Sequence, residues 1–146
     1  MFSLEFEAYP FRFSEQNGRR YIFDVARNKY VTLTPEEWVR QHLLYYFRQS
    51  MNYPKGLTAV ERHVKVNGLN LRYDIVVYDS RQNPWMLVEC KEPDVPITEK
   101  TMHQLLRYYR VLQCPYWLLS NGATNYCAAV KDGNISWLHK LPAYDG

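Results

Sequence analysis

The sequence predicts a mixed α/β (α+β) fold, in which the order helix-strand-strand-strand-helix-strand follows a β-rich N-terminal extension. Two observations carry this prediction. Apolar and polar residues alternate in stretches separated by Asn-Gly and Asp-Gly pairs, which is typical of strands joined by tight hairpins. Two other segments have helical spacing of apolar residues and begin with capping residues or after prolines, which indicates helices between the strands.

Residues 1–33 are expected to form the β-rich extension, with strands at 11–13 and 21–23 on either side of Asn17-Gly18. The run Thr34-Pro35-Glu36-Glu37 then combines an N-cap, a proline at the first helical position and a glutamate at the third, which is a capping-box pattern. It predicts a helix that ends near Ser50. The residues expected to pack inward share helical spacing: Val39, His42, Leu43, Tyr46 and Phe47.

Three strands are predicted next, at 60–67, 71–78 and 85–91, with a hairpin turn at Asn67-Gly68 and turn residues at 79–83. Pro93 and Pro96 end the third strand, and a second helix is predicted from Thr98 to about Leu112. Further strands are expected at 116–119, 126–130 and 135–139, around the turns Asn121-Gly122 and Asp132-Gly133.

Length and composition favour a single domain over residues 1–146, divided into the extension (1–33), a core (34–122) and C-terminal strands (123–146). A net charge of only +3 excludes a general polycation that coats DNA or an anionic membrane. Cys90, Cys114 and Cys127 form no CxxC pair and are expected to be reduced core residues, which favours a cytoplasmic protein. With no run of about 18 apolar residues, no membrane partner is expected.

Two acids and a lysine are the most informative residues. A hairpin centred on 79–83 would place 79 opposite 84, Val76 opposite Leu87 and Asp74 opposite Glu89, and Lys91 would share the face of Glu89 because side chains alternate along a strand. Facing carboxylates repel each other and are partly desolvated, so a cation is expected beside them. A divalent metal with oxygen ligands, next to a lysine, suits hydrolysis of a phosphodiester.

A wider set of residues matches known proteins in identity, order and spacing over about 35–122: Pro35-Glu36-Glu37-Trp38-Val39-Arg40, Glu61, Arg72-Tyr73-Asp74-Ile75-Val76-Val77-Tyr78, Leu87-Val88-Glu89-Cys90-Lys91, Gln104 with Tyr108, and Leu119-Ser120-Asn121-Gly122. In this set the chain resembles the PD-(D/E)xK nuclease superfamily, and more closely the N-terminal nuclease domain of type I restriction enzyme R subunits. The resemblance implies a restriction-endonuclease-like core with a mixed central sheet, and a role in restriction-modification as a Mg²⁺-dependent DNA endonuclease.

The same resemblance implies roles for individual residues. Asp74, Glu89 and the backbone carbonyl of Cys90 would bind Mg²⁺ or Mn²⁺, with Glu37 as a further acid from the helix. Lys91 would orient the attacking water or stabilise the transition state. Gln104 and Tyr108 match the Gln-x-x-x-Tyr element of RecB-type nucleases and lie one helical turn apart. Basic residues that flank the site are candidates for contacts with DNA phosphates: Arg40, Arg72 and Arg107.

Other interpretations stay open. The acids and Lys91 also fit a solvated ion-pair network, Glu37 a helix cap, Gln104 a surface residue and Tyr108 a core aromatic. The arginines also fit plain surface charge. The alternative function is a non-catalytic nucleic-acid-binding or protein-interaction module that keeps the nuclease fold. None of the six glycines opens a Gly-x-x-x-x-Gly-Lys-Ser/Thr loop, so DNA translocation would require a separate motor protein or other restriction-modification subunits.

Overall fold

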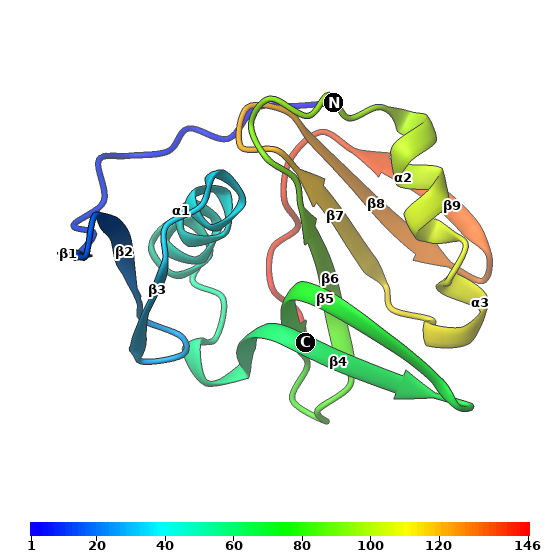
Figure 1. The fold of residues 1–146 in the computed structure, drawn as a ribbon. Coiled ribbons are helices and arrows are strands. Elements are labelled where there is room, and N and C mark those ends of the chain that lie inside the picture. The colour runs from blue at the N-terminus through cyan, green and yellow to red at the C-terminus, as the bar shows by residue number, and fades with distance from the viewer.

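Two β-sheets lie on either side of the long helix α1 in the computed structural model (Figure 1). The structure describes residues 1–146, apart from the side chain of Val66. The N-terminal strands form a three-stranded sheet, and the remaining strands form a six-stranded mixed sheet with α2 packed on the face opposite α1. The predicted mixed α+β fold is therefore confirmed.

The three-stranded sheet consists of β1 (Phe13–Gln16), β2 (Arg19–Asp24) and β3 (Lys29–Thr32), all antiparallel. Asn17 and Gly18 have φ values of 53° and 77°, as the predicted tight hairpin turn requires. The first strand begins at Phe13, which pairs with Ile22, so the strand predicted at 11–13 lies two residues too early. The strand β3 was not predicted.

Helix α1 (Pro35–Gln49) has the predicted bounds. The Thr34 hydroxyl accepts a hydrogen bond from the backbone N–H of Glu37 at 3.0 Å, which is the N-cap half of the predicted capping box. Val39, Leu43 and Phe47 are fully buried against the six-stranded sheet, as predicted. His42 is also buried, but it lies among the aromatic rings of the N-terminal segment.

The six-stranded sheet has the order β4-β5-β6-β7-β8-β9. A short 3₁₀ helix η1 (Lys55–Leu57) leads into the sheet, whose strands are β4 (Thr58–Val66), β5 (Leu69–Tyr78), β6 (Pro84–Cys90), β7 (Tyr116–Ser120), β8 (Asn125–Lys131) and β9 (Asn134–Leu138). These bounds agree with the predicted strands to within two residues. Strands β6 and β7 run parallel because a helical crossover joins them, and the other neighbouring pairs are antiparallel.

The crossover holds two helices where one was predicted. Helix α2 (Glu99–Leu106) begins at Thr98, whose side chain forms a capping box with Thr101. After α2 the hydrogen bonding changes to the 3₁₀ pattern: the N–H of Tyr108 donates to the carbonyl of Leu105, three residues earlier, at 3.4 Å. The chain then turns and continues as the single-turn helix α3 (Tyr109–Leu112).

Both faces of the six-stranded sheet are buried, so the chain has a core on each side. Helix α1 covers the face with Ile75 and Val88, and α2 covers the face with Val76 and Leu87. The three cysteines are buried and free, as predicted, and burial raises the pKa of Cys114 and of Cys127 to about 12. Among the described residues no helix is long and apolar enough to cross a membrane.

Candidate functional site

The hairpin β5–β6 has the predicted register at its centre, where Val76 pairs with Leu87. A register shift after Val77 places Tyr78, rather than Asp79, opposite Pro84, so that part of the prediction is wrong. The backbone pairing runs to Ile75 and Val88. Beyond this pairing, the backbone N–H of Cys90 donates to the carboxylate of Asp74 at 2.8 Å. The two strands therefore separate where the predicted site begins.

Asp74 is held by α1. Its Oδ1 accepts a hydrogen bond from Arg40 Nη2 at 2.8 Å, and its Oδ2 accepts the one from Cys90, with the side chain 17% exposed. On the neighbouring strand β4, Glu61 has a φ of 50° between the residues that pair with Tyr73 and Ile75, so the strand is distorted beside Asp74. Each carboxylate oxygen of Asp74 keeps a second lone pair for another ligand.

Glu36 lies next to Asp74 and was missed by the sequence analysis. Burial raises the pKa of Glu36, and the charge of Asp74 raises it further, while the nearby cations Arg40 and Lys91 oppose these effects. The Glu36 side chain is 43% exposed and pairs with Arg40 at 3.2 Å. Glu36 and Asp74 therefore form a pair of like charges within reach of Lys91.

Four of the five predicted catalytic residues line one pocket of about 310 Å³: Glu89, Lys91, Gln104 and Tyr108. Lys91 Nζ lies 3.7 Å from Glu89 Oε1, and each of these side chains is 38% exposed. The break between α2 and α3 does not separate Gln104 from Tyr108, because both still face this pocket. The fifth residue, Asp74, does not line it. Lys91 joins the pocket to the pair formed by Asp74 and Glu36.

Tyr73 is a further residue of this pocket that was not assigned a role. Its ring is buried against Trp117, and its hydroxyl has no hydrogen-bond partner among the described residues. Burial raises the pKa of Tyr73, and the charge of Glu89 is among the smaller causes in the same direction. The Tyr73 hydroxyl is therefore a buried polar group without a partner, behind the wall of the pocket.

Glu37 and Arg40 are buried and bound to other charged side chains. Glu37 Oε1 accepts hydrogen bonds from Arg27 at 2.8 Å and Arg40 at 2.7 Å, and Oε2 accepts one from Gln41 at 3.1 Å. These donors bind both oxygens of the buried Glu37 carboxylate, so Glu37 belongs to an internal network of charges. Its role as the helix metal ligand stays a prediction, and Glu36 is the more exposed acid of α1. The Arg40 side chain is only 5% exposed and pairs with Glu37 and Asp74. It therefore cannot reach a DNA phosphate, contrary to the prediction.

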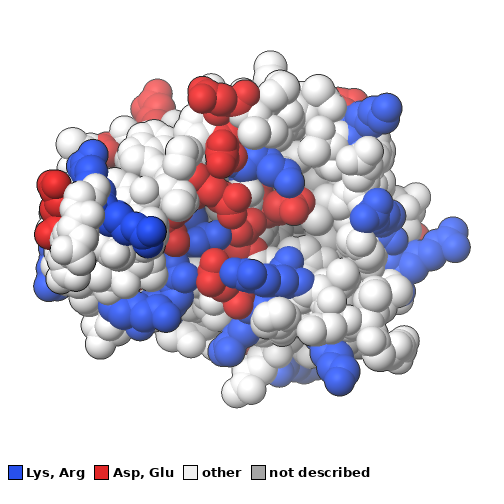
Figure 2. Space-filling model, in the orientation of Figure 1, with Lys and Arg blue, Asp and Glu red and all other residues white. Residues whose placement is uncertain are grey.

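Arginines from three elements surround these acids. Arg27, from the turn between β2 and β3, pairs with Asp24 and reaches Glu61 at 3.1 Å, and Arg72 of β5 contacts Glu61 at 2.6 Å. Arg72 is exposed and borders the pocket of Glu89, as does Arg107. Figure 2 shows Asp and Glu side chains in a band down the middle of this face, with Lys and Arg side chains on both sides.

The donors suit a hard divalent cation, because the carboxylates of Asp74, Glu36 and Glu89 and the carbonyl of Cys90 all offer oxygen. Burial raises the pKa of Glu36 most, and the charge of Asp74 raises it further; a bound cation would relieve the repulsion between these two acids. No group of three or more His, Cys, Asp or Glu side chains is already arranged to hold a metal ion among the described residues. The residues therefore fit a cation in their chemistry, and Arg40 provides the positive charge beside Asp74.

Comparison with known proteins identifies the family of the chain. Residues 35–142 match the family model described as the type I restriction enzyme R protein N terminus. No curated protein matches the chain. Among solved structures, the cryoEM structure of a DrdV–DNA complex aligns with 17% sequence identity and a TM-score of 0.46, covering 70% of this chain and 10% of that chain. The chain thus spans about a tenth of the length of that structure's chain.

Proposed function

The chain belongs to the type I restriction enzyme R protein N-terminus family, and from this premise we propose that it is a metal-dependent DNA endonuclease domain that hydrolyses phosphodiester bonds. The observation that carries the proposal is the pocket in which Glu89, Lys91, Gln104 and Tyr108 meet, next to the acids Asp74 and Glu36. These residues come from α1, β5, β6 and the residue after it, α2 and the turn before α3, so the tertiary fold brings them together.

Lys91 has the central role in this proposal. Its ammonium group lies 3.7 Å from the Glu89 carboxylate, and its charge also acts on Glu36. In that position it can donate a hydrogen bond to a phosphate oxygen and stabilise the charge that develops there. Gln104 and Tyr108 would hold the DNA backbone against Lys91 through further hydrogen bonds.

The metal in this proposal is Mg²⁺ or Mn²⁺, held by Asp74, Glu89 and the carbonyl oxygen of Cys90, with Glu36 as the acid from α1. When bound, such an ion neutralises phosphate charge and lowers the pKa of water. Arg40 keeps the Asp74 carboxylate oriented from the other side through its hydrogen bond to Oδ1. Movement along DNA would come from a separate motor or another restriction-modification subunit.

Cleavage of supercoiled plasmid tests this proposal. Purified protein is expected to nick or cut the plasmid with Mg²⁺ or Mn²⁺ and to lose this activity in EDTA. The variants Asp74→Ala, Lys91→Met and Glu89→Gln should each abolish cleavage, whereas Glu15→Gln, an exposed acid of β1, should cut like the wild type. Cleavage that survives both Asp74→Ala and Lys91→Met would refute the mechanism.

The ion pair between Arg40 and Asp74 favours a second candidate, a module that binds nucleic acid or protein without turnover. An internal arginine already neutralises Asp74, as a metal would in a nuclease. Such a module would bind DNA with equal affinity in EDTA and in Mg²⁺, and Asp74→Asn would leave that affinity unchanged. Fluorescence anisotropy with a labelled duplex, in the presence and absence of Mg²⁺, separates the two candidates.

A further inference from the structure

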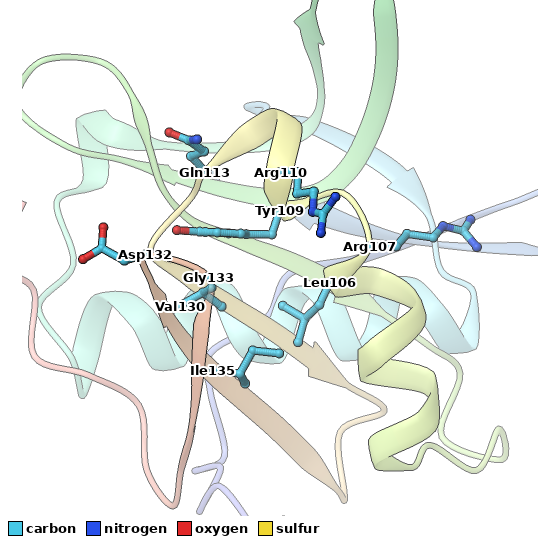
Figure 3. A pocket seen from close by; sticks show the side chains of 9 residues that line it. All are labelled: Leu106, Arg107, Tyr109, Arg110, Gln113, Val130, Asp132, Gly133 and Ile135. Carbon is cyan, nitrogen blue, oxygen red and sulfur yellow. The ribbon is translucent and has the colours of Figure 1, made fainter.

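A second pocket shares Arg107 with the candidate site. Figure 3 shows the residues that line it. Its volume is about 500 Å³, and its walls come from α2, α3 and the β8–β9 hairpin. Arg107 lines both pockets. Its guanidinium donates a hydrogen bond at 2.8 Å to the hydroxyl of Tyr108, which is a residue of the candidate site. The two pockets therefore meet at Arg107.

The lining of this second pocket combines three kinds of surface. Leu106, Val130 and Ile135 provide an apolar wall, and Ile135 is 40% exposed although it is a large apolar residue. The ring of Tyr109 lies across the pocket, with its hydroxyl toward Asp132 (Figure 3). A flat aromatic ring beside exposed apolar side chains suits a planar ligand that stacks on it.

The charges divide the pocket into two ends. Arg107 and Arg110 lie toward one end and Asp132 lies at the other in Figure 3. The cationic end is the one that adjoins the candidate site, because Arg107 belongs to both pockets. A ligand with a negative group and a planar ring would therefore place its negative group toward the candidate site and its ring toward Asp132.

We propose that this pocket binds a nucleotide of the DNA strand next to the phosphate that is cleaved. Its base stacks on Tyr109, and its phosphate contacts Arg107 and Arg110. The pocket volume falls within the range of roughly 300 to 1,000 Å³ that is common for small-molecule sites. The inference rests on the proposed nuclease function, since it treats the neighbouring pocket as the place where the strand is cut.

The same geometry predicts which bases bind best. The carboxylate of Asp132 accepts hydrogen bonds and cannot donate them, so it favours a base with an exocyclic amino group. Cytosine and adenine carry such a group on their pairing edge, whereas thymine does not. Because the pairing edge is free in a single strand, the pocket should prefer unpaired DNA and should bind oligo(dC) more tightly than oligo(dT).

Fluorescence anisotropy in EDTA, where a metal-dependent enzyme cannot cut, measures this binding directly. The probes are short fluorescein-labelled oligo(dC) and oligo(dT) at several salt concentrations, with free dCMP as competitor. We expect Tyr109→Leu to weaken oligo(dC) binding about tenfold, because stacking on an aromatic ring is lost. Arg110→Gln should lower the slope of log affinity against log salt by about one, because one phosphate contact is lost. Lys55→Gln, an exposed charge on η1, should change neither quantity.

Asp132→Asn is the sharpest variant. Asp132 has a φ of 52°, which Asn also tolerates, so the turn before Gly133 is expected to keep its shape. An amide both donates and accepts hydrogen bonds, so the preference for oligo(dC) over oligo(dT) should disappear while total binding remains. Misfolding would instead weaken binding of both probes, and circular dichroism of each variant would detect it.

The outcomes separate this inference from the nuclease proposal. Wild-type affinity in Tyr109→Leu, together with an unchanged preference for oligo(dC) in Asp132→Asn, would overturn the pocket assignment, even in a protein that cuts plasmid DNA. Oligo(dC) binding that depends on Tyr109, in a protein that cuts nothing, would uphold the pocket and overturn the nuclease. Binding of dCMP alone, with no oligonucleotide bound, would assign the pocket to free nucleotides and overturn the strand assignment. Failure to bind any probe would overturn it as well.

Discussion

Arg40 of α1 and Asp74 of β5 form a hydrogen-bonded ion pair, with 2.8 Å between Arg40 Nη2 and Asp74 Oδ1. The same guanidinium contacts Glu37 at 2.7 Å. Burial disfavours the charge on Arg40, but the hydrogen bond to Asp74 and the charge of Glu37 raise the pKa of Arg40 above its ordinary value. Arg40 thus connects the first helix to the strand that carries the first predicted catalytic acid.

Replacing Arg40 is expected to destabilise the fold strongly. Arg40→Met would keep the length of the side chain but leave Asp74 without its cation and Glu37 with Arg27 as its remaining arginine, at a cost of about 3–5 kcal/mol. Urea denaturation monitored by tryptophan fluorescence measures this change in the free energy of unfolding. Arg62→Met, on the exposed side of β4, is the matched control. Equal losses in the two variants would contradict the structural role of Arg40.

Glu36 should make stability depend on pH. Because the pKa of Glu36 is raised in the fold above the value of 4.5, the native state binds its proton more tightly than the unfolded state. Native stability is therefore lost as pH rises through the range between these two pKa values. We expect the melting temperature of the wild type, relative to Glu36→Gln, to fall from pH 4 to pH 7, and added Mn²⁺ to reduce that difference. If the melting temperatures of the two proteins change equally with pH in the absence of metal, the raised pKa of Glu36 is contradicted.

His42 should act in the opposite direction. Burial lowers the pKa of His42 below 6.5, and the hydrogen bond between Nδ1 and the carbonyl of Trp38, at 2.7 Å, opposes this effect only partly. The unfolded state therefore binds the proton more tightly, and stability falls as pH drops below about 6.5. Scanning calorimetry at pH 7 and pH 5 should show a smaller decrease in His42→Phe than in the wild type. The exposed His63→Phe, in β4, should retain the full decrease.

Tyr73→Phe should separate stability from activity. The hydroxyl of Tyr73 is buried without a partner among the described residues, so removing it should raise the free energy of unfolding by about 1 kcal/mol. Because the buried hydroxyl cannot contact DNA in the pocket, the same substitution should leave the rate of plasmid cleavage unchanged. Chemical denaturation and cleavage rates on one protein sample test both statements. A stability loss in Tyr73→Phe would indicate that the hydroxyl has an internal partner.

Most helices and strands could be predicted from the sequence because turn pairs and capping patterns involve residues that are neighbours in the chain. Asn-Gly and Asp-Gly pairs adopt the positive φ values that hairpin turns need, as at Asn67-Gly68, and this fixed the strands around them. Local patterns could not show which acid of α1, Glu36 or Glu37, lies next to Asp74. Both acids lie in the first turn of α1, and Arg27, which binds Glu37, comes from another sheet. The break after α2 was missed because residues 98–112 have continuous helical spacing.

The parallel contact between β6 and β7 has a consequence for how the protein folds. On either side of it the strands form antiparallel hairpins between neighbours in sequence, which close quickly. Glu89 lies opposite Leu119, and the N–H of Lys91 donates to the carbonyl of Ser120 at 2.8 Å. The positions of Glu89 and Lys91 therefore depend on the pairing of β6 with β7. We therefore expect the pocket to assemble late, after the two halves of the chain have formed and docked.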